Sequence, residues 1–81
     1  AGVYVGLPRD TSRTLALQMV YGSTRLVMDT GKHPAELKDM VVSPGGTTAE
    51  GVQALEQAGV PAAIVNAVSA AYLKSIKLGQ G

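Results

Sequence analysis

The chain has 81 residues, enough for one small domain, with no cysteine and a single histidine. Disulfides and cysteine-ligated metals are excluded, and one imidazole without a second ligand does not predict a zinc site, so we expect no metal. The net charge is +1, 16% of residues are charged, and Phe and Trp are absent, which argues against nucleic-acid binding. The longest nearly apolar run, residues 60–73, is short for a bilayer span and contains Asn66. No secretory signal is visible, so we expect a cytoplasmic protein without a membrane segment.

The first six residues are typical of the last turn of a helix that Gly6 ends, without a start signal of its own. This pattern suggests a fragment of a longer protein. A long helix is then predicted from about Pro8 to Thr30, with Gly31 as its C-cap. Its apolar residues form three neighbouring stripes and leave only a narrow polar edge, so we expect it to be buried on most sides. Gly22, inside this helix, favours either close approach of another helix or a bend.

A short helix over residues 35–42 is predicted next, with Pro34 at its first position. His33 precedes it, and we interpret it as a local hydrogen-bonding residue, because no acid or nucleophile is paired with it in the sequence.

Two further helices complete the chain. One is predicted over residues 48–58, with Val52 and Leu55 on its inner face and Gly59 as its stop signal. The last runs from Pro61 to about Leu78 and is rich in Ala and Val, so that little of it suits contact with water. No strand pattern is present.

Between the second and third of these helices lies the run Ser43-Pro44-Gly45-Gly46-Thr47-Thr48. Proline and two glycines predict a rigid turn. We expect Thr47 to be the N-cap of the following helix, with Glu50 completing a capping box. The N–H groups and positive dipole of such a helix start suit a carboxylate or a phosphate. Taken alone, the run is also compatible with an ordinary turn before a helix.

The predicted fold class is all-α: a helical bundle-like domain that interlocks with a second copy. Two of the predicted helices are apolar on nearly all sides, and only two short helices are available to cover them. Large exposed apolar surfaces indicate association. A helical homo-oligomer therefore follows from the residues alone.

Four runs in this sequence resemble the C-terminal domain of pyrroline-5-carboxylate reductase, over almost the whole chain. They are Gly6-Leu7-Pro8-Arg9, His33-Pro34-Ala35-Glu36-Leu37-Lys38-Asp39, Val42-Ser43-Pro44-Gly45-Gly46-Thr47-Thr48, and Leu55-Glu56 with Gly59. The resemblance implies a C-terminal helical domain of the 6-phosphogluconate dehydrogenase-like type, spanning residues 1–81. It implies self-association as a homodimer, with decamers as a further assembly.

The same resemblance implies the activity of the parent protein: reduction of 1-pyrroline-5-carboxylate to L-proline, the last step of proline biosynthesis, with hydride from NADPH or NADH. In that family an N-terminal dinucleotide-binding domain holds the cofactor. This chain has no Gly-x-Gly-x-x-Gly run and no βαβ alternation, so that domain is absent from it. We therefore expect no cofactor binding and no turnover from this piece alone.

The resemblance also implies roles for the residues of the central run. Ser43, Gly45, Gly46, Thr47 and Thr48 correspond to the substrate-binding loop, whose backbone N–H groups hold the substrate carboxylate. Thr48 corresponds to the catalytic threonine, whose hydroxyl hydrogen-bonds the ring nitrogen of the substrate. No cofactor-binding residue corresponds to any position in this chain.

A rival hypothesis comes from another class: a stand-alone helical oligomerisation or anion-binding module without catalytic activity. The sequence upstream of Ala1 in the gene discriminates between the two. A βαβ unit with a dinucleotide fingerprint there supports the reductase, and its absence supports the module.

Overall fold

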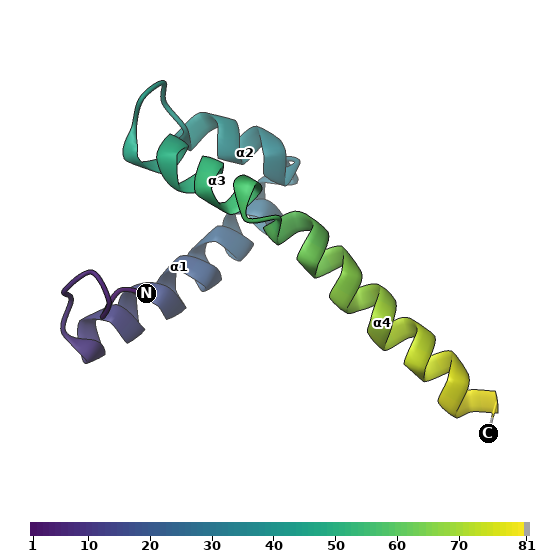
Figure 1. Ribbon diagram of the computed structural model, residues 1–81. Coiled ribbons are helices and arrows are strands. Elements are labelled where there is room, and N and C mark those ends of the chain that lie inside the picture. Colours follow the sequence, from purple (N-terminus) through teal and green to yellow (C-terminus); the bar gives the residue numbers. More distant parts are fainter. Residues whose placement is uncertain (81) are drawn as a thin grey trace. The chain divides into compact units, whose positions relative to one another are not determined.

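The computed structural model describes residues 1–80, which form four helices and no strand (Figure 1). The helices are α1 (Arg9–Thr30), α2 (Pro34–Val41), α3 (Thr47–Gln57) and α4 (Val60–Gln80). The predicted all-α class is confirmed. The chain divides into two compact units, the first over Ala1–Met40 and the second beginning at Val41.

The first unit opens with a hydrogen-bonded turn that ends at Gly6. The Leu7 N–H donates to the Gly2 carbonyl over 2.9 Å, and the Gly6 N–H donates to the Val3 carbonyl over 3.0 Å. Gly6 has a positive φ of 108°, so the pattern is that of a Schellman motif, which ends a helical turn. The interpretation of Gly6 as a stop signal is confirmed.

Helix α1 begins at Arg9, one residue later than predicted, because Pro8 has an extended ψ of 147° and forms the N-cap. It ends as predicted: Gly31 is left-handed with φ 67°, and its N–H donates to the Val27 carbonyl. Along the polar edge, the Arg25 guanidinium donates to the Tyr21 hydroxyl and pairs with Asp29, each within 3.4 Å.

Helix α2 begins at Pro34, where the missing N–H of proline costs no helical hydrogen bond. Just before it, His33 Nδ1 accepts a hydrogen bond from the Ala35 N–H over 3.1 Å. This contact confirms the local hydrogen-bonding role predicted for His33. The helix ends at Val41, one residue earlier than predicted.

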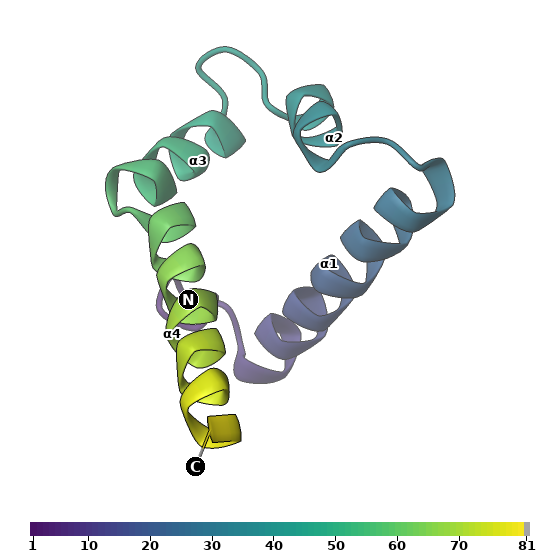
Figure 2. The same cartoon turned by 90° about the vertical axis from the view of Figure 1, so that its right-hand side faces the viewer.

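In the second unit, α3 and α4 contact each other around a bend of 48° (Figure 2). Gly59, with φ 76°, allows the chain to turn there, as its stop-signal role predicts. On the predicted inner face of α3, Val52 is half-buried, but Leu55 remains 53% exposed. That expectation is wrong within this chain, because α4 bends away and covers little of α3. Helix α4 continues through Gly79 to Gln80.

Both long helices keep their apolar side chains exposed. Among residues 1–80, within neither unit does a residue pair twelve or more positions apart bring its Cα atoms within 8 Å, so the contacts within each unit are local. The one apolar side chain that is buried among the described residues is Leu37. Side chains that stay at least 40% exposed are Leu15, Leu17, Met19, Val20, Tyr21, Leu26 and Met28 on α1, and Ile64, Val65, Val68, Tyr72, Leu73, Ile76 and Leu78 on α4.

No single helix within residues 1–80 is long and apolar enough to cross a membrane. By length and composition alone, the bent pair of α3 and α4 passes that test jointly.

Candidate substrate-binding loop

The residues of the central run form a tight turn in the second unit. The Gly46 N–H donates to the Ser43 carbonyl over 3.0 Å, which closes a four-residue turn. Pro44 occupies its second position, and Gly45, with φ 70°, occupies its third. Proline followed by a residue with positive φ is the signature of a type II turn. The rigid turn predicted from the sequence is therefore present.

The turn leads directly into α3, and Gly46 is the N-cap of that helix. Its φ of −79° and ψ of 169° are extended, and its carbonyl accepts the first helical hydrogen bond, from the Glu50 N–H over 3.2 Å. Thr47 is the first helical residue and not the cap, so the predicted capping role of Thr47 is wrong. The capping box with Glu50 fails for the same reason, because Glu50 now stands at the fourth helical position, one beyond the third position that the box requires.

The start of α3 has no side-chain cap among the described residues. The N–H groups of Thr47, Thr48 and Ala49 occupy the first three helical positions, where no earlier carbonyl lies within reach of a helical hydrogen bond. A helix end of this kind carries roughly half a positive charge. Three backbone donors and this dipole together suit a small anion such as a carboxylate.

The five residues predicted to bind substrate thus lie together: Ser43 and Gly45 in the turn, Gly46 at the cap, and Thr47 and Thr48 in the first helical turn. Ser43, Thr47 and Thr48 are exposed, so their side chains are accessible from solvent at the start of α3. Sequence reasoning missed the backbone of Ala49, which supplies a third donor. The preference for glycine as well as threonine at N-caps could have indicated this shift by one residue.

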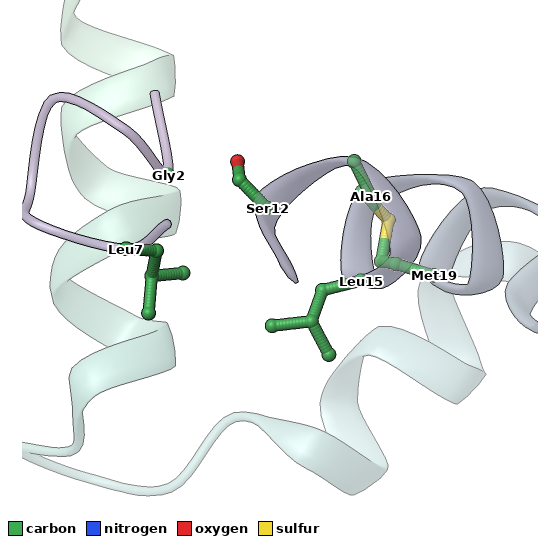
Figure 3. Close-up of a pocket in the computed structure, with 6 residues that line it drawn as sticks. All are labelled: Gly2, Leu7, Ser12, Leu15, Ala16 and Met19. Atoms are coloured by element: carbon green, nitrogen blue, oxygen red, sulfur yellow. The ribbon is translucent and has the colours of Figure 1, made fainter. Parts of the chain in front are cut away.

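A hollow of about 260 Å³ lies elsewhere, between the N-terminal turn and α1 in the first unit. Figure 3 shows Leu7 and Leu15 on opposite sides of it, with the Ser12 hydroxyl at its edge. This lining is apolar apart from one hydroxyl and offers no cation or cluster of donors, so it does not suit a carboxylate substrate. Within residues 1–80, no group of three His, Cys, Asp or Glu side chains could hold a metal ion.

Comparison with known proteins gives one consistent family. The family described as pyrroline-5-carboxylate reductase dimerisation matches residues 1–78. A pyrroline-5-carboxylate reductase of Synechocystis sp. is 52% identical over 79 residues, which cover 98% of this chain and 30% of that protein. The enzyme of the same name from Escherichia coli is 48% identical over 80 residues, covering 99% of this chain and 30% of that protein.

A solved structure agrees with these relatives. The crystal structure of Plasmodium falciparum pyrroline carboxylate reductase with NADP bound matches with a TM-score of 0.82 and 42% sequence identity. The match covers 85% of this chain and 28% of that one. The chain therefore spans about 30% of the length of the curated relatives it matches. With residues 1–78 matched by its dimerisation region, the chain belongs to the pyrroline-5-carboxylate reductase family.

Proposed function

We propose that the protein containing this chain is a pyrroline-5-carboxylate reductase, which reduces 1-pyrroline-5-carboxylate to L-proline. In this proposal residues 1–81 are its C-terminal dimerisation and substrate-binding domain, and an N-terminal dinucleotide-binding domain occupies other parts of the protein. The observation that carries the proposal is the uncapped start of α3 behind the Ser43–Gly46 turn, within a region that matches reductases of that name.

The substrate is a cyclic imine with one carboxylate, and this loop offers a group for each part. The N–H groups of Thr47, Thr48 and Ala49 would bind the carboxylate, with the Ser43 hydroxyl as a further donor. The Thr48 hydroxyl would donate a hydrogen bond to the ring nitrogen and favour the more electrophilic form of the imine. By fixing both ends of the substrate, the loop would contribute to the rate through orientation.

The cofactor, NADPH or NADH, supplies the hydride in this proposal. The pyrophosphate of such cofactors binds at a glycine-rich strand-to-helix turn, and the described residues contain neither a strand nor that turn. These residues do not fit the cofactor, so we assign it to the dinucleotide-binding domain. We expect titration calorimetry of the 81-residue chain with NADPH or NADH to give no saturable heat. Tight binding of either one would contradict this assignment.

The domain's family and its exposed apolar helices support self-association. We propose a homodimer as the basic assembly, with decamers formed from dimers, in a cytoplasmic protein. Mass measurement by light scattering on the full-length protein distinguishes a dimer from a decamer.

The test of the proposed function is a steady-state assay of the full-length protein. With 1-pyrroline-5-carboxylate present, we expect the absorbance of NADPH or NADH to fall as it is oxidised and proline to form. Neither change should occur without the imine. Absence of turnover with both NADPH and NADH would contradict the reductase. In that case, together with the lack of a dinucleotide fingerprint upstream in the gene, the oligomerisation or anion-binding module would be favoured instead.

A further inference from the structure

Two adjacent glycines in the loop are constrained by different features of the structure. Gly45 has φ 70°, a conformation that side-chain-bearing residues rarely adopt, yet a Cβ there would meet nothing within 4 Å. Gly46 has an ordinary φ of −79°, which any residue can adopt. A Cβ on Gly46, however, would lie 2.5 Å from Ser43 Oγ and 3.2 Å from the Ser43 carbonyl oxygen. The backbone requires glycine at position 45, whereas the space beside Ser43 requires it at position 46.

The crowded position is also the N-cap of α3. Most helices place Ser, Thr, Asp or Asn there, whose side-chain oxygen accepts a hydrogen bond from the second or third helical N–H. At Gly46 no such oxygen exists, and the Ser43 hydroxyl occupies the space where a capping side chain would begin. The Ser43 hydroxyl makes no capping hydrogen bond to α3. No side chain among the described residues therefore accepts a hydrogen bond from the first N–H groups of α3, and the Ser43 hydroxyl lies beside the N-cap.

We propose that Gly46 is a positioning residue that keeps the Ser43 hydroxyl beside the uncapped start of α3, so that both reach the same substrate carboxylate. This inference rests on the proposed function of the loop. Any side chain at position 46 would force the hydroxyl to rotate away. Ser43 Oγ is the free end of a short side chain and can rotate, and the Ser43 carbonyl, 3.2 Å from the added Cβ, needs to shift by only a few tenths of an ångström. The fold should therefore survive while substrate binding weakens.

The test compares Gly46→Ala, Ser43→Ala and the double variant in the full-length reductase. We expect Gly46→Ala to lower kcat/KM for 1-pyrroline-5-carboxylate roughly tenfold to a hundredfold, the size of one lost hydrogen bond to a carboxylate. The loss should appear in KM for the imine and not in KM for the nicotinamide. The double variant should be no worse than Ser43→Ala, because the atom that Gly46→Ala displaces is already gone. Additive losses, or a Gly46→Ala enzyme with wild-type KM, would overturn the proposal.

Two further variants separate positioning from general damage. Gly51→Ala, in the middle of α3 with nothing within 4 Å of its added Cβ, is the matched control and should keep the wild-type KM. Gly46→Asp places its Cβ in the same contact with Ser43 Oγ, so KM for the imine should rise at least as much as in Gly46→Ala. An unchanged KM in Gly46→Asp would also overturn the proposal. A wild-type enzyme without turnover would contradict the proposed function itself and is thereby distinguished from failure of this inference.

Discussion

Thr47 and Thr48 are adjacent at the start of α3, and neither side chain caps the helix. Their hydroxyl groups are therefore available for other roles. Thr47 is the first helical residue and Thr48 the second, so they project about 100° apart around the helix axis. Of these two, we propose that Thr48 donates to the ring nitrogen of the substrate.

We predict that Thr48→Ala in the full-length protein lowers kcat roughly tenfold to a hundredfold, corresponding to the loss of a hydrogen bond worth about 1.5–3 kcal/mol to a charged group. Steady-state kinetics measures this effect. Thr48→Ser, which keeps the hydroxyl, should retain most of the activity. Wild-type turnover in Thr48→Ala would remove Thr48 from the catalytic role.

A second prediction concerns stability at Thr47. If Thr47 were the N-cap, Thr47→Ala would cost about 1 kcal/mol. Because the cap is Gly46, we expect the free energy of unfolding to change by less than about 0.5 kcal/mol, as for ordinary surface positions. Denaturant titration of both forms at the same protein concentration checks this. A loss near 1 kcal/mol would mean that Thr47 caps the helix in solution.

At the scale of elements, Gly22 lies in the interior of α1, and no contact within the described residues explains why this position is a glycine. A Cβ on Gly22 would meet only Gln18 Nε2, at 3.9 Å, and Gly22 makes no kink-forming turn, since α1 runs unbroken from Arg9 to Thr30. Glycine costs a helix interior about 1 kcal/mol relative to alanine. We interpret Gly22 as a place where another helix, in a second copy of the chain, approaches α1 closely.

We therefore predict that Gly22→Ala raises the dimer dissociation constant, although it improves helix propensity. Sedimentation equilibrium across a dilution series measures this change. Gly51→Ala in α3, equally free of neighbours within this chain, is the control and should leave the dissociation constant unchanged. An unchanged or lower dissociation constant with Gly22→Ala would contradict close approach of another helix at position 22.

Much of this secondary structure could be predicted from glycine and proline alone. Gly6, Gly31 and Gly59 all have positive φ and end helical segments, as their positions in the sequence indicate. The start of α3 was misplaced by one residue, because glycine and threonine are both acceptable N-caps and the choice depends on the hydrogen bond from Gly46 to Ser43. The exposure of Leu55 could not be predicted, since it depends on the angle between α3 and α4.

The loop illustrates the same limit. Its residue types indicated an anion site, and the structure brings them into one turn and one helix start. Ser43 Oγ occupies the space that a Cβ on Gly46 would need. This placement could not be predicted, because it depends on the rotamer of Ser43 and not on residue type. Patterns in the sequence specify where a turn lies, whereas distances within it require coordinates.

At the scale of the whole molecule, the exposed apolar side chains on α1 and α4 predict that this domain is stable only when associated. Burying one large apolar side chain such as Val, Leu, Ile or Met contributes about 1.5–3 kcal/mol, and each of these two helices keeps six such side chains and one tyrosine at least 40% exposed. We predict that light scattering finds at least a dimer at micromolar concentration. A well-folded monomer would contradict this prediction.

A charge placed on the apolar surface should break that association. We expect Val68→Lys, at a site that is 65% exposed in the single chain, to shift the population to monomer and to lower helicity measured by circular dichroism. Gln53→Lys, on an exposed position of the shorter α3, is the control and should leave the dimer intact. Equal behaviour of the two variants would place the interface elsewhere.

The purely local contacts within each unit have a consequence for how the molecule is made. Helices form within about a microsecond and loops of about ten residues close within about 0.1 microseconds, so the early steps of folding are unimolecular and fast. If α1 and α4 are buried by a second copy, as we propose, the contacts that bury them form only when two chains meet. The rate-limiting step of refolding should then be bimolecular, with a half-time that shortens in proportion to protein concentration. A newly synthesised chain would have to bind a second copy before the apolar side chains of its long helices are buried.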